Sequence, residues 1–313
     1  MLKMRSIMKN IITFLVLFCF SAGILLAQDT ETKKCENSNK SLLGYFMLKD
    51  GKPVSESYMG TYLIDNQTNM MPQAKSLEMV IQHRFSNLSD GWSNLFGIYG
   101  AANTRIGLNY SITDWAQVSY GITKTYMVSD FGLKLNILKQ SRNNNCPLDV
   151  TYYGNWSISG QNKENYGLNY QCNNRFAFFN ELLLTRKLCD WATVSVGGSF
   201  THFNQADSLW DHDMIALHFL GRFKVTPQSS IIVNCDLPLK VKNIQEWTEI
   251  QNPLTYNFGF GYEIATATHV FQIFAGSGQY LVQSYNIMYN DNKFFYSTKD
   301  IVIGFNITRQ WNF

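Results

Sequence analysis

The last 13 residues, from Ile301 to Phe313, read IVIGFNITRQWNF and alternate between two kinds of side chain. The apolar positions are Ile301, Ile303, Phe305, Ile307, Trp311 and Phe313, and between them lie Gly304, Asn306, Thr308, Gln310 and Asn312. Successive side chains of a β-strand point to opposite faces of a sheet, so a period of two predicts a strand with one apolar face. Strands of soluble proteins usually have about 5–6 residues, whereas a strand that crosses a membrane needs about 9–11. The stretch therefore predicts a membrane-crossing strand with one face in lipid and the other in a lumen.

The same stretch resembles the C-terminal signal of outer-membrane β-barrel proteins. That signal ends in phenylalanine and carries aromatic or apolar residues at alternate positions before it. The resemblance implies that Phe305, Trp311 and Phe313 form a membrane-insertion signal that the barrel-assembly machinery reads. Arg309 interrupts the apolar face, but a side chain of this length can reach the lipid headgroups.

Similar alternation recurs upstream. It predicts strands at 77–85, 103–113, 115–127, 131–139, 148–159, 175–187, 191–203, 212–226, 230–240, 254–265, 268–276 and 299–313. We therefore expect an all-β protein, an antiparallel up-and-down transmembrane barrel of about 12 strands, with 10 or 14 as alternatives.

The lengths of the connections test this topology independently, because such barrels alternate short periplasmic turns with longer extracellular loops. With Phe313 on the periplasmic side, about nine of the eleven connections follow the rule. The two exceptions are 140–147, which is long where a short turn is expected, and 128–130, which is short where a long loop is expected.

The first 27 residues are typical of a secretory signal peptide, with three basic residues, an uncharged stretch from Ile11 to Phe20 and small residues up to Ala27. An uncleaved anchor is the alternative interpretation. Residues 28–75 lack sustained periodicity, so we predict a periplasmic N-terminal segment there, with a plug in the lumen as the alternative. The transmembrane barrel then covers residues 76–313.

Composition agrees with a barrel and excludes some functions. Mean hydropathy is −0.16 although 45% of the residues are hydrophobic, so apolar and polar residues must be interleaved. Three of the 26 basic residues lie in the signal peptide, which leaves 23 basic and 23 acidic residues and gives no electrostatic reason to expect nucleic acid as a partner. The cysteines have neither paired spacing nor metal-ligand spacing, so we expect no disulfide framework and no metal site.

A wider resemblance covers roughly residues 60–159. Its motifs are GTYLIDNQT at 60–68, then Leu77-Glu78, IQHRF at 81–85 and RIGL at 105–108 with Tyr110, and His269-Val270-Phe271-Gln272 forms a later His-x-Phe strand. This set resembles an uncharacterised family of Bacteroidota outer-membrane β-barrel proteins. The resemblance implies the fold and the outer membrane of a Gram-negative bacterium, with its lipid as the surroundings, and it implies no activity.

Charged residues on the inward faces are the candidate functional residues. A Lys or Arg facing lipid at mid-bilayer would cost about 2–4 kcal/mol, which favours placing them inside. The candidates that would line the lumen are Arg84, Arg105, Lys134, Arg175, Glu181, His218, Arg222, Lys224 and Glu263, with Glu78 on the same face. Two readings remain open: a selectivity lining that mildly favours anions, and a set of salt bridges that fill a small barrel.

We find no set of residues with the pattern of a catalytic site or a cofactor site. Asp211-His212-Asp213 is predicted to be a solvated loop, because no nucleophile accompanies it. The leading hypothesis is a narrow passive or substrate-selective pore for small solutes, without enzymatic activity and without a cofactor. The alternatives are a closed-lumen barrel with a structural or surface-interaction role, and a barrel-embedded hydrolase.

Overall fold

The structure is a computed structural model that describes residues 53–55, 57–142, 144, 146–206, 210–239, 241, 255–292 and 300–313. The predicted signal peptide lies outside these residues. In the described part of the chain, no helix has the length and apolar character needed to cross a membrane. The four cysteines in this part, Cys146, Cys172, Cys189 and Cys235, are free thiols.

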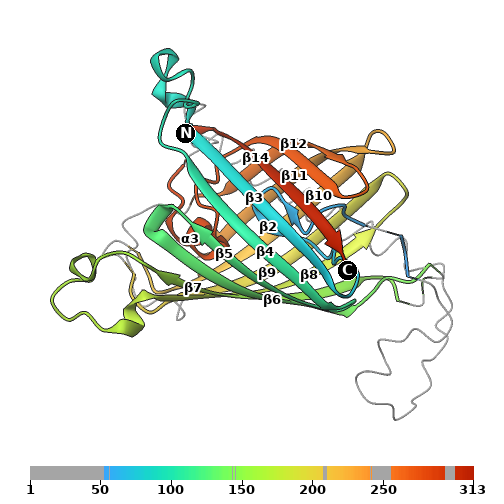
Figure 1. Cartoon of the computed structure of the whole chain (residues 1–313), viewed down its shortest axis with the longest axis horizontal. Helices are drawn as coiled ribbons and strands as arrows, with labels where there is room; N and C mark the ends of the chain where they lie inside the picture. The colour runs from blue at the N-terminus through green and yellow to red at the C-terminus, as the bar shows by residue number, and fades with distance from the viewer. Residues whose placement is uncertain are drawn as a thin grey trace, which may run out of the picture. The chain divides into compact units, whose positions relative to one another are not determined.

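Twelve long antiparallel strands form a closed barrel (Figure 1). They are β3 (Ser76–Asn87), β4 (Asn103–Thr113), β5 (Ala116–Thr123), β6 (Val128–Leu138), β7 (Asp149–Ser159), β8 (Phe176–Lys187), β9 (Ala192–Phe203), β10 (Asp213–Lys224), β11 (Ser229–Leu239), β12 (Asn257–Ala265), β13 (His269–Gly276) and β14 (Val302–Asn312). Each strand pairs with the next along the chain, and β14 pairs with β3 to close the sheet. The predicted fold class and strand number are confirmed.

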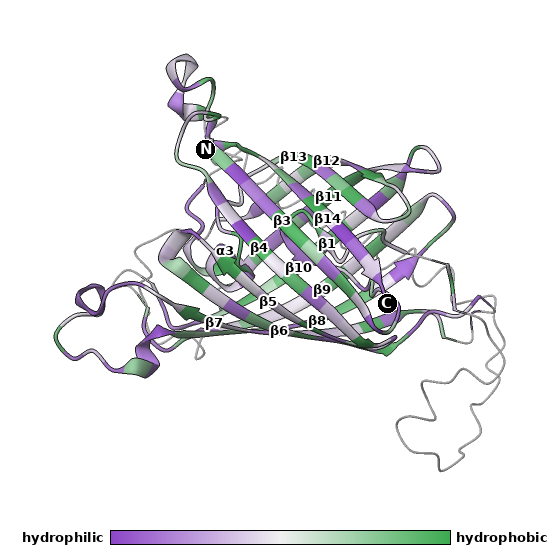
Figure 2. Cartoon of the chain, viewed as in Figure 1, coloured by the Kyte–Doolittle hydropathy of each residue, from purple (hydrophilic) through white to green (hydrophobic). Residues whose placement is uncertain are grey.

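Alternation of side chains gives the wall two different surfaces. Along β4 and β8, buried and exposed residues take turns, and hydropathy changes sign from residue to residue along many strands (Figure 2). Large apolar residues such as Ile106, Leu108, Phe131, Leu182 and Ile273 are exposed on the outside of the barrel. An apolar outer band of this kind is what a lipid bilayer requires of a barrel.

A small hairpin occupies the interior of the barrel. It consists of β1 (Tyr62–Leu63) and β2 (Asn66–Gln67), and its residues are buried. Hydrogen bonds join it to side chains from strands around the wall, including Gln272 of β13, Asp236 of β11 and Arg84 of β3. The prediction of a purely periplasmic segment at 28–75 is therefore wrong for Tyr58–Thr68, which forms the plug that was its alternative.

The long turn at 140–147 has a structural reason. Pro53 and Ser141 form an isolated antiparallel bridge, and the Val54 amide donates to the Gln140 carbonyl at 2.9 Å. Arg142 Nε also donates to the Pro53 carbonyl at 3.1 Å. This turn is thus longer than a simple hairpin connection because it holds the N-terminal segment where that segment enters the barrel.

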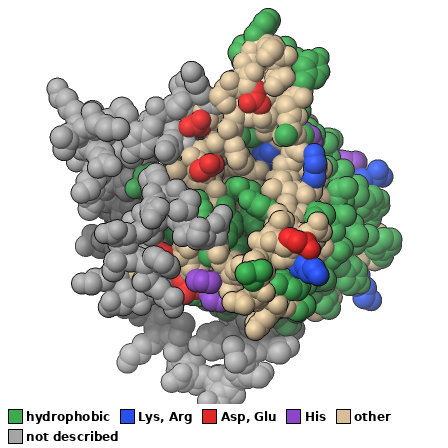
Figure 3. Space-filling model, turned by 90° about the vertical axis from the view of Figure 1, so that its left-hand side faces the viewer, with side chains coloured by type: hydrophobic (Ala, Val, Ile, Leu, Met, Phe, Trp, Pro, Cys, Tyr) green, Lys and Arg blue, Asp and Glu red, His purple; other side chains and the backbone are tan. Residues whose placement is uncertain are grey.

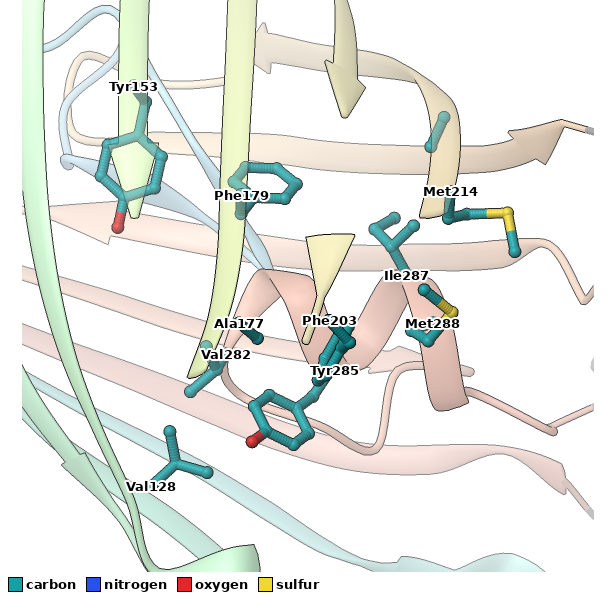
Figure 4. Packing of buried hydrophobic residues seen from close by; sticks show 11 residues of the cluster. Val128, Tyr153, Ala177, Phe179, Phe203, Met214, Val282, Tyr285, Ile287 and Met288 are labelled. Carbon is teal, nitrogen blue, oxygen red and sulfur yellow. The ribbon is translucent and has the colours of Figure 1, made fainter. Parts of the chain in front are cut away.

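The β13–β14 connection also folds into the barrel. Its helix α3 (Gln283–Tyr289) packs against the inner wall through Val282, Tyr285, Ile287 and Met288. The wall residues of the same cluster are Val128, Tyr153, Ala177, Phe179, Phe203, Met214 and Ala216. Figure 4 shows Phe203 and Ala177 beside Tyr285 and Val282, and Met214 near Ile287 and Met288. The lumen is therefore filled by two separate segments, the hairpin and α3.

Candidate functional site in the barrel lumen

Polar contacts from six of the twelve wall strands hold the hairpin and the residues next to it. From the plug, Thr61 Oγ1 donates to Glu78 at 2.7 Å and Asn66 Nδ2 donates to Asp236 at 2.6 Å, while the Tyr58 and Ser195 hydroxyls share a hydrogen bond of 2.8 Å. From the wall, Gln272 Nε2 donates to the Tyr62 carbonyl and Asn306 Nδ2 to the Ile64 carbonyl, both at 2.8 Å. Lys134 Nζ donates to the carbonyls of Thr68 and Met70 at 3.1 and 2.9 Å. These partners lie on β3, β6, β9, β11, β13 and β14. The hairpin therefore spans the lumen from one side to the other.

The tip of the hairpin has an unfavourable backbone geometry. Ile64 has a φ of +57°, which is rare for a β-branched residue. Its carbonyl accepts from Asn306 and from Arg84, and its amide donates to Gln272. Such a conformation persists only where the surroundings over-determine it, and here the barrel wall does so.

An apolar patch on the inner wall packs against the apolar residues of the hairpin and against Tyr58. Leu183, Leu220, Ile232 and Phe274 point inward and pack against Tyr58, Leu63 and Ile64. Inward apolar residues of this kind make short apolar runs in the sequence, such as Leu182-Leu183-Leu184 and Ile231-Ile232-Val233. These interruptions of the alternation are the sequence signal that the lumen is not simply filled with water.

Three buried ion pairs neutralise the arginines of the lumen. Arg84 binds Asp65 of the hairpin at 2.7 Å, and Arg222 Nε binds Glu263 at 2.8 Å. Arg105 makes a two-pronged contact with Asp130, with distances of 2.9 and 2.6 Å. Burial raises the pKa of the Asp65 carboxyl, and the Arg84 guanidinium opposes that shift. Breaking such a pair is costly because it leaves a buried charge without its partner.

Most of the predicted lumen residues do lie inside the barrel. Arg84, Arg105, Lys134, Glu181, His218, Arg222 and Glu263 are buried, as is Glu78. Two are not in the lumen interior. Arg175 belongs to the short helix η5 (Cys172–Arg175) before β8 and lines the cavity at that end of the barrel, and Lys224 is half-buried at the last position of β10, so both lie at the barrel ends and not in the interior.

The inward charges differ from the count made on the sequence. Among the described residues of the strands and the hairpin, the buried bases are Arg84, Arg105, Lys134 and Arg222, and the buried acids are Asp65, Glu78, Asp130, Asp149, Glu181, Asp236 and Glu263. The lumen has an excess of acidic groups. The excess of inward bases on which the expected mild preference for anions was based is therefore not found, because Asp65, Asp130, Asp149 and Asp236 were not assigned to the interior and Arg175 and Lys224 were. The preference itself stays a prediction.

One chain of side chains was not predicted, although His218 was placed in the lumen. His218 Nδ1 lies 2.8 Å from Asp236 Oδ1, and His218 Nε2 lies 2.6 Å from Ser199 Oγ. This is the order and spacing of an Asp–His–Ser triad, which is recognised by geometry and not by sequence position. The three residues are on β9, β10 and β11, so only the register of neighbouring strands brings them together.

Two cavities lie at the two ends of the barrel. The cavity at the barrel end where the C-terminus lies has a volume of about 350 Å³, and its lining includes Pro53, Asn69, Gln140 and Asn312. The other, at the end of the longer loops, has a volume of about 540 Å³. We call the second one the mouth site, and its aromatic residues are Tyr126, Tyr166, Phe203, Trp210, Tyr280, Tyr285 and Tyr289. Figure 3 faces this end and shows hydrophobic side chains in the opening between the loops.

A closed antiparallel barrel with an apolar outer band and a polar interior defines an integral outer-membrane β-barrel protein. The chain belongs to the family described as a membrane bound beta barrel domain (DUF5777), whose model matches residues 58–311. The match starts at Tyr58, so the family includes the hairpin as well as the barrel. A Bacteroidota origin stays a prediction.

Solved structures of similar architecture are distant in sequence. The COG4313 outer membrane channel from Pseudomonas putida F1 is 11% identical, with 77% of this chain and 97% of that chain covered and a TM-score of 0.48. The KdgM porin is 6% identical, with 76% and 99% covered and a TM-score of 0.41. LpxR from Salmonella typhimurium is 11% identical, with 76% and 100% covered and a TM-score of 0.36. None of the curated proteins compared with the chain matches it.

Proposed function

We propose that this protein is a gated outer-membrane channel for small solutes, closed in its resting state by the N-terminal hairpin. The observation that supports this most is the nature of the plug. The hairpin is a separate segment that is bound to the wall by side-chain contacts, while the wall closes on itself through the β14–β3 pairing. Moving the hairpin would therefore leave the barrel wall intact.

The chemical character of the interior is a second argument for a channel that passes polar solutes. Charged and amide side chains line it, and a cavity lies at each end of the plugged region. The hairpin separates the two cavities together with α3, whose Gln283 contacts Asn66 at 3.5 Å. Opening then requires only that the hairpin leaves, because α3 loses its contact with Asn66 at the same time and can give way.

The test compares conductance with and without the plug. Tyr62–Gln67 is replaced by a Gly–Ser segment of equal length, and the control carries the same replacement at Trp92–Gly97 in an exposed loop. Heat-modifiable gel migration verifies that each barrel is folded. We expect steady conductance across a planar bilayer for the hairpin variant only. A folded, inserted hairpin variant with no conductance above the bare bilayer would refute the channel and favour a closed structural barrel.

The Asp236–His218–Ser199 chain favours a second candidate function, hydrolysis of an ester. Ser199 Oγ would attack the carbonyl carbon while its proton passes to His218 Nε2, and the ester C–O bond would then break with that proton going to the leaving alcohol. Water, deprotonated by His218, would hydrolyse the acyl-serine and return the proton to Ser199, while Asp236 holds the opposite ring nitrogen. This function ranks second because the three residues are buried and because Asn66 of the hairpin donates a hydrogen bond to the Asp236 carboxylate. Neither end cavity is lined by Ser199.

A fluorophosphonate probe tests this candidate directly, because it labels an activated serine covalently. The hairpin variant described above is incubated with the probe, and the same variant with Ser199→Ala is the control. Labelling that depends on Ser199 would support a hydrolase. Equal labelling of both proteins, or of neither, would reject the hydrolase. Asp236, His218 and Ser199 would then serve only as hydrogen-bonding residues of the wall that hold the plug.

A further inference from the structure

The mouth site has a continuous aromatic lining that the channel itself does not require. Tyr126 stacks on Tyr280, with ring centroids 5.9 Å apart and an interplanar angle of 11°, and on Tyr285 at 5.5 Å and 27°. Phe203 meets Tyr285 edge to face at 5.0 Å. Trp210 meets Tyr289 in the same manner at 5.6 Å. Rings fixed by their neighbours in this way form a rigid surface for a ligand.

Separate connections of the barrel build this surface. Tyr126 comes from the β5–β6 connection, Trp210 from the β9–β10 connection, and Tyr280, Tyr285 and Tyr289 from the β13–β14 connection. Tyr126 holds a φ of +56°, and Met127 beside it holds +49°. Strained backbone at non-glycine residues concentrates at ligand-binding and catalytic positions, because the surrounding structure must maintain it. The β5–β6 connection, predicted at 128–130 and observed at 124–127, is thus the one that places Tyr126.

Neutral polar groups complete the lining. Gln161, Asn165, Asn174 and Gln205 contribute amides, which can donate and accept hydrogen bonds. Gln205 Nε2 donates to the Tyr166 carbonyl at 3.0 Å, while its Oε1 is buried and has no hydrogen-bond partner in the described part of the chain. A buried acceptor without a partner needs an explanation, and a donor on a bound ligand provides one.

The charge at the mouth site does not favour an anion. Arg175 Nε donates to the Tyr170 hydroxyl at 2.6 Å, and its Nη1 donates to the carbonyls of Ser159 and Gln161 at 2.9 and 2.5 Å. Its guanidinium also lies over the Tyr166 and Tyr170 rings. The arginine is therefore used to hold the loop. Asp291 is a carboxylate in the lining, and it can accept from hydroxyl groups.

We propose that the mouth site binds a neutral saccharide. The C–H face of a sugar ring is weakly electropositive and packs on the electron-rich face of an aromatic ring. Its hydroxyls both donate and accept, as the surrounding amides do, and one of them would satisfy Gln205 Oε1. The volume of about 540 Å³ falls in the range of small-ligand sites, about 300–1,000 Å³.

Isothermal titration of the refolded full chain in detergent tests the proposal. The probes are maltotriose, chitobiose, mannobiose and, as charged comparisons, glucuronate and choline. Tyr289→Ala and Gln205→Leu are the variants, and Tyr99→Ala, which removes an exposed tyrosine from another loop, is the matched control. Gel migration verifies folding. We expect a neutral sugar to bind, with at least a tenfold loss in Tyr289→Ala, a smaller loss in Gln205→Leu and no loss in Tyr99→Ala.

Three outcomes would overturn the proposal. The first is that no sugar binds to the folded protein. The second is equal binding by Tyr289→Ala, which would place the sugar elsewhere. The third is that choline or glucuronate binds more tightly than every neutral sugar, which would assign the site to a cation or an anion. Titration measures binding without conductance, so failure of the channel proposal leaves this test unaffected.

Discussion

Removing the Asp65 carboxylate gives the most direct test of how the lumen is closed. In the docked hairpin it is the ionic partner of Arg84, whose side chain is only 1% exposed. Asp65→Ala leaves a buried guanidinium without its counter-charge, and losing one partner of a buried pair costs about 3–5 kcal/mol. Release of the hairpin would return Arg84 to water and relieve this cost. At about 1.4 kcal/mol per factor of ten, the equilibrium shifts toward release by roughly two to three and a half powers of ten.

The assay is the open fraction of single channels in a planar bilayer, measured for the wild type, Asp65→Ala and the double variant Asp65→Leu with Arg84→Met. The double variant removes both charges, and apolar replacement of a whole buried pair is often neutral. It should therefore stay closed, while Asp65→Ala opens. Asp190→Ala, which removes an exposed carboxylate from a turn, is the control. An inserted Asp65→Ala barrel that opens no more often than the wild type would refute the plug as the gate.

Three further predictions concern pH, selectivity and assembly. Burial raises the pKa of Tyr58 and of Tyr62 above the ordinary value of 10.0, so the released hairpin ionises at a lower pH than the docked one, and a rise in pH through 10 favours opening. The test compares the wild type with the double variant Tyr58→Phe and Tyr62→Phe. Conductance that rises above pH 10 only in the wild type would verify the prediction, and the same pH dependence of conductance in both proteins would contradict it. The acidic excess of the lumen predicts that the opened channel prefers cations; reversal potentials in a salt gradient measure it, and Glu181→Gln should weaken the preference. Deleting Phe313, which is 83% exposed, should reduce membrane yield strongly although it removes few contacts; normal yield of the truncated chain would argue against its role as a signal.

The wall of the barrel could be predicted because its cause is local. Each strand must present apolar side chains to lipid at every second position, and this demand leaves a period of two in the sequence. All twelve predicted strands correspond to observed ones with ends that differ by a few residues. The C-terminal stretch is the clearest case, since β14 covers Val302–Asn312 of the predicted 299–313.

The contents of the lumen could not be predicted in the same way. The hairpin has no long periodic pattern, because its short strands are buried on all sides by the wall. Asp236 was not predicted because the inward face of its strand also carries Ile232, which is apolar and packs on the hairpin. The sequence of this strand therefore does not show which face is polar. Ser199 meets His218 only through strand register, which one sequence without a structure does not define.

The position of the hairpin also constrains the order in which the molecule can form. The seam that completes the barrel joins β14 to β3, and one side chain from each of these strands, Asn306 and Arg84, bonds the same Ile64 carbonyl. The hairpin is tethered to β3 by the few residues between Gln67 and Ser76. A segment on so short a tether is most easily enclosed while the seam is still apart. The hairpin can then serve as a template that brings the first and last strands into register, so the segment that fills the finished lumen would also guide its construction.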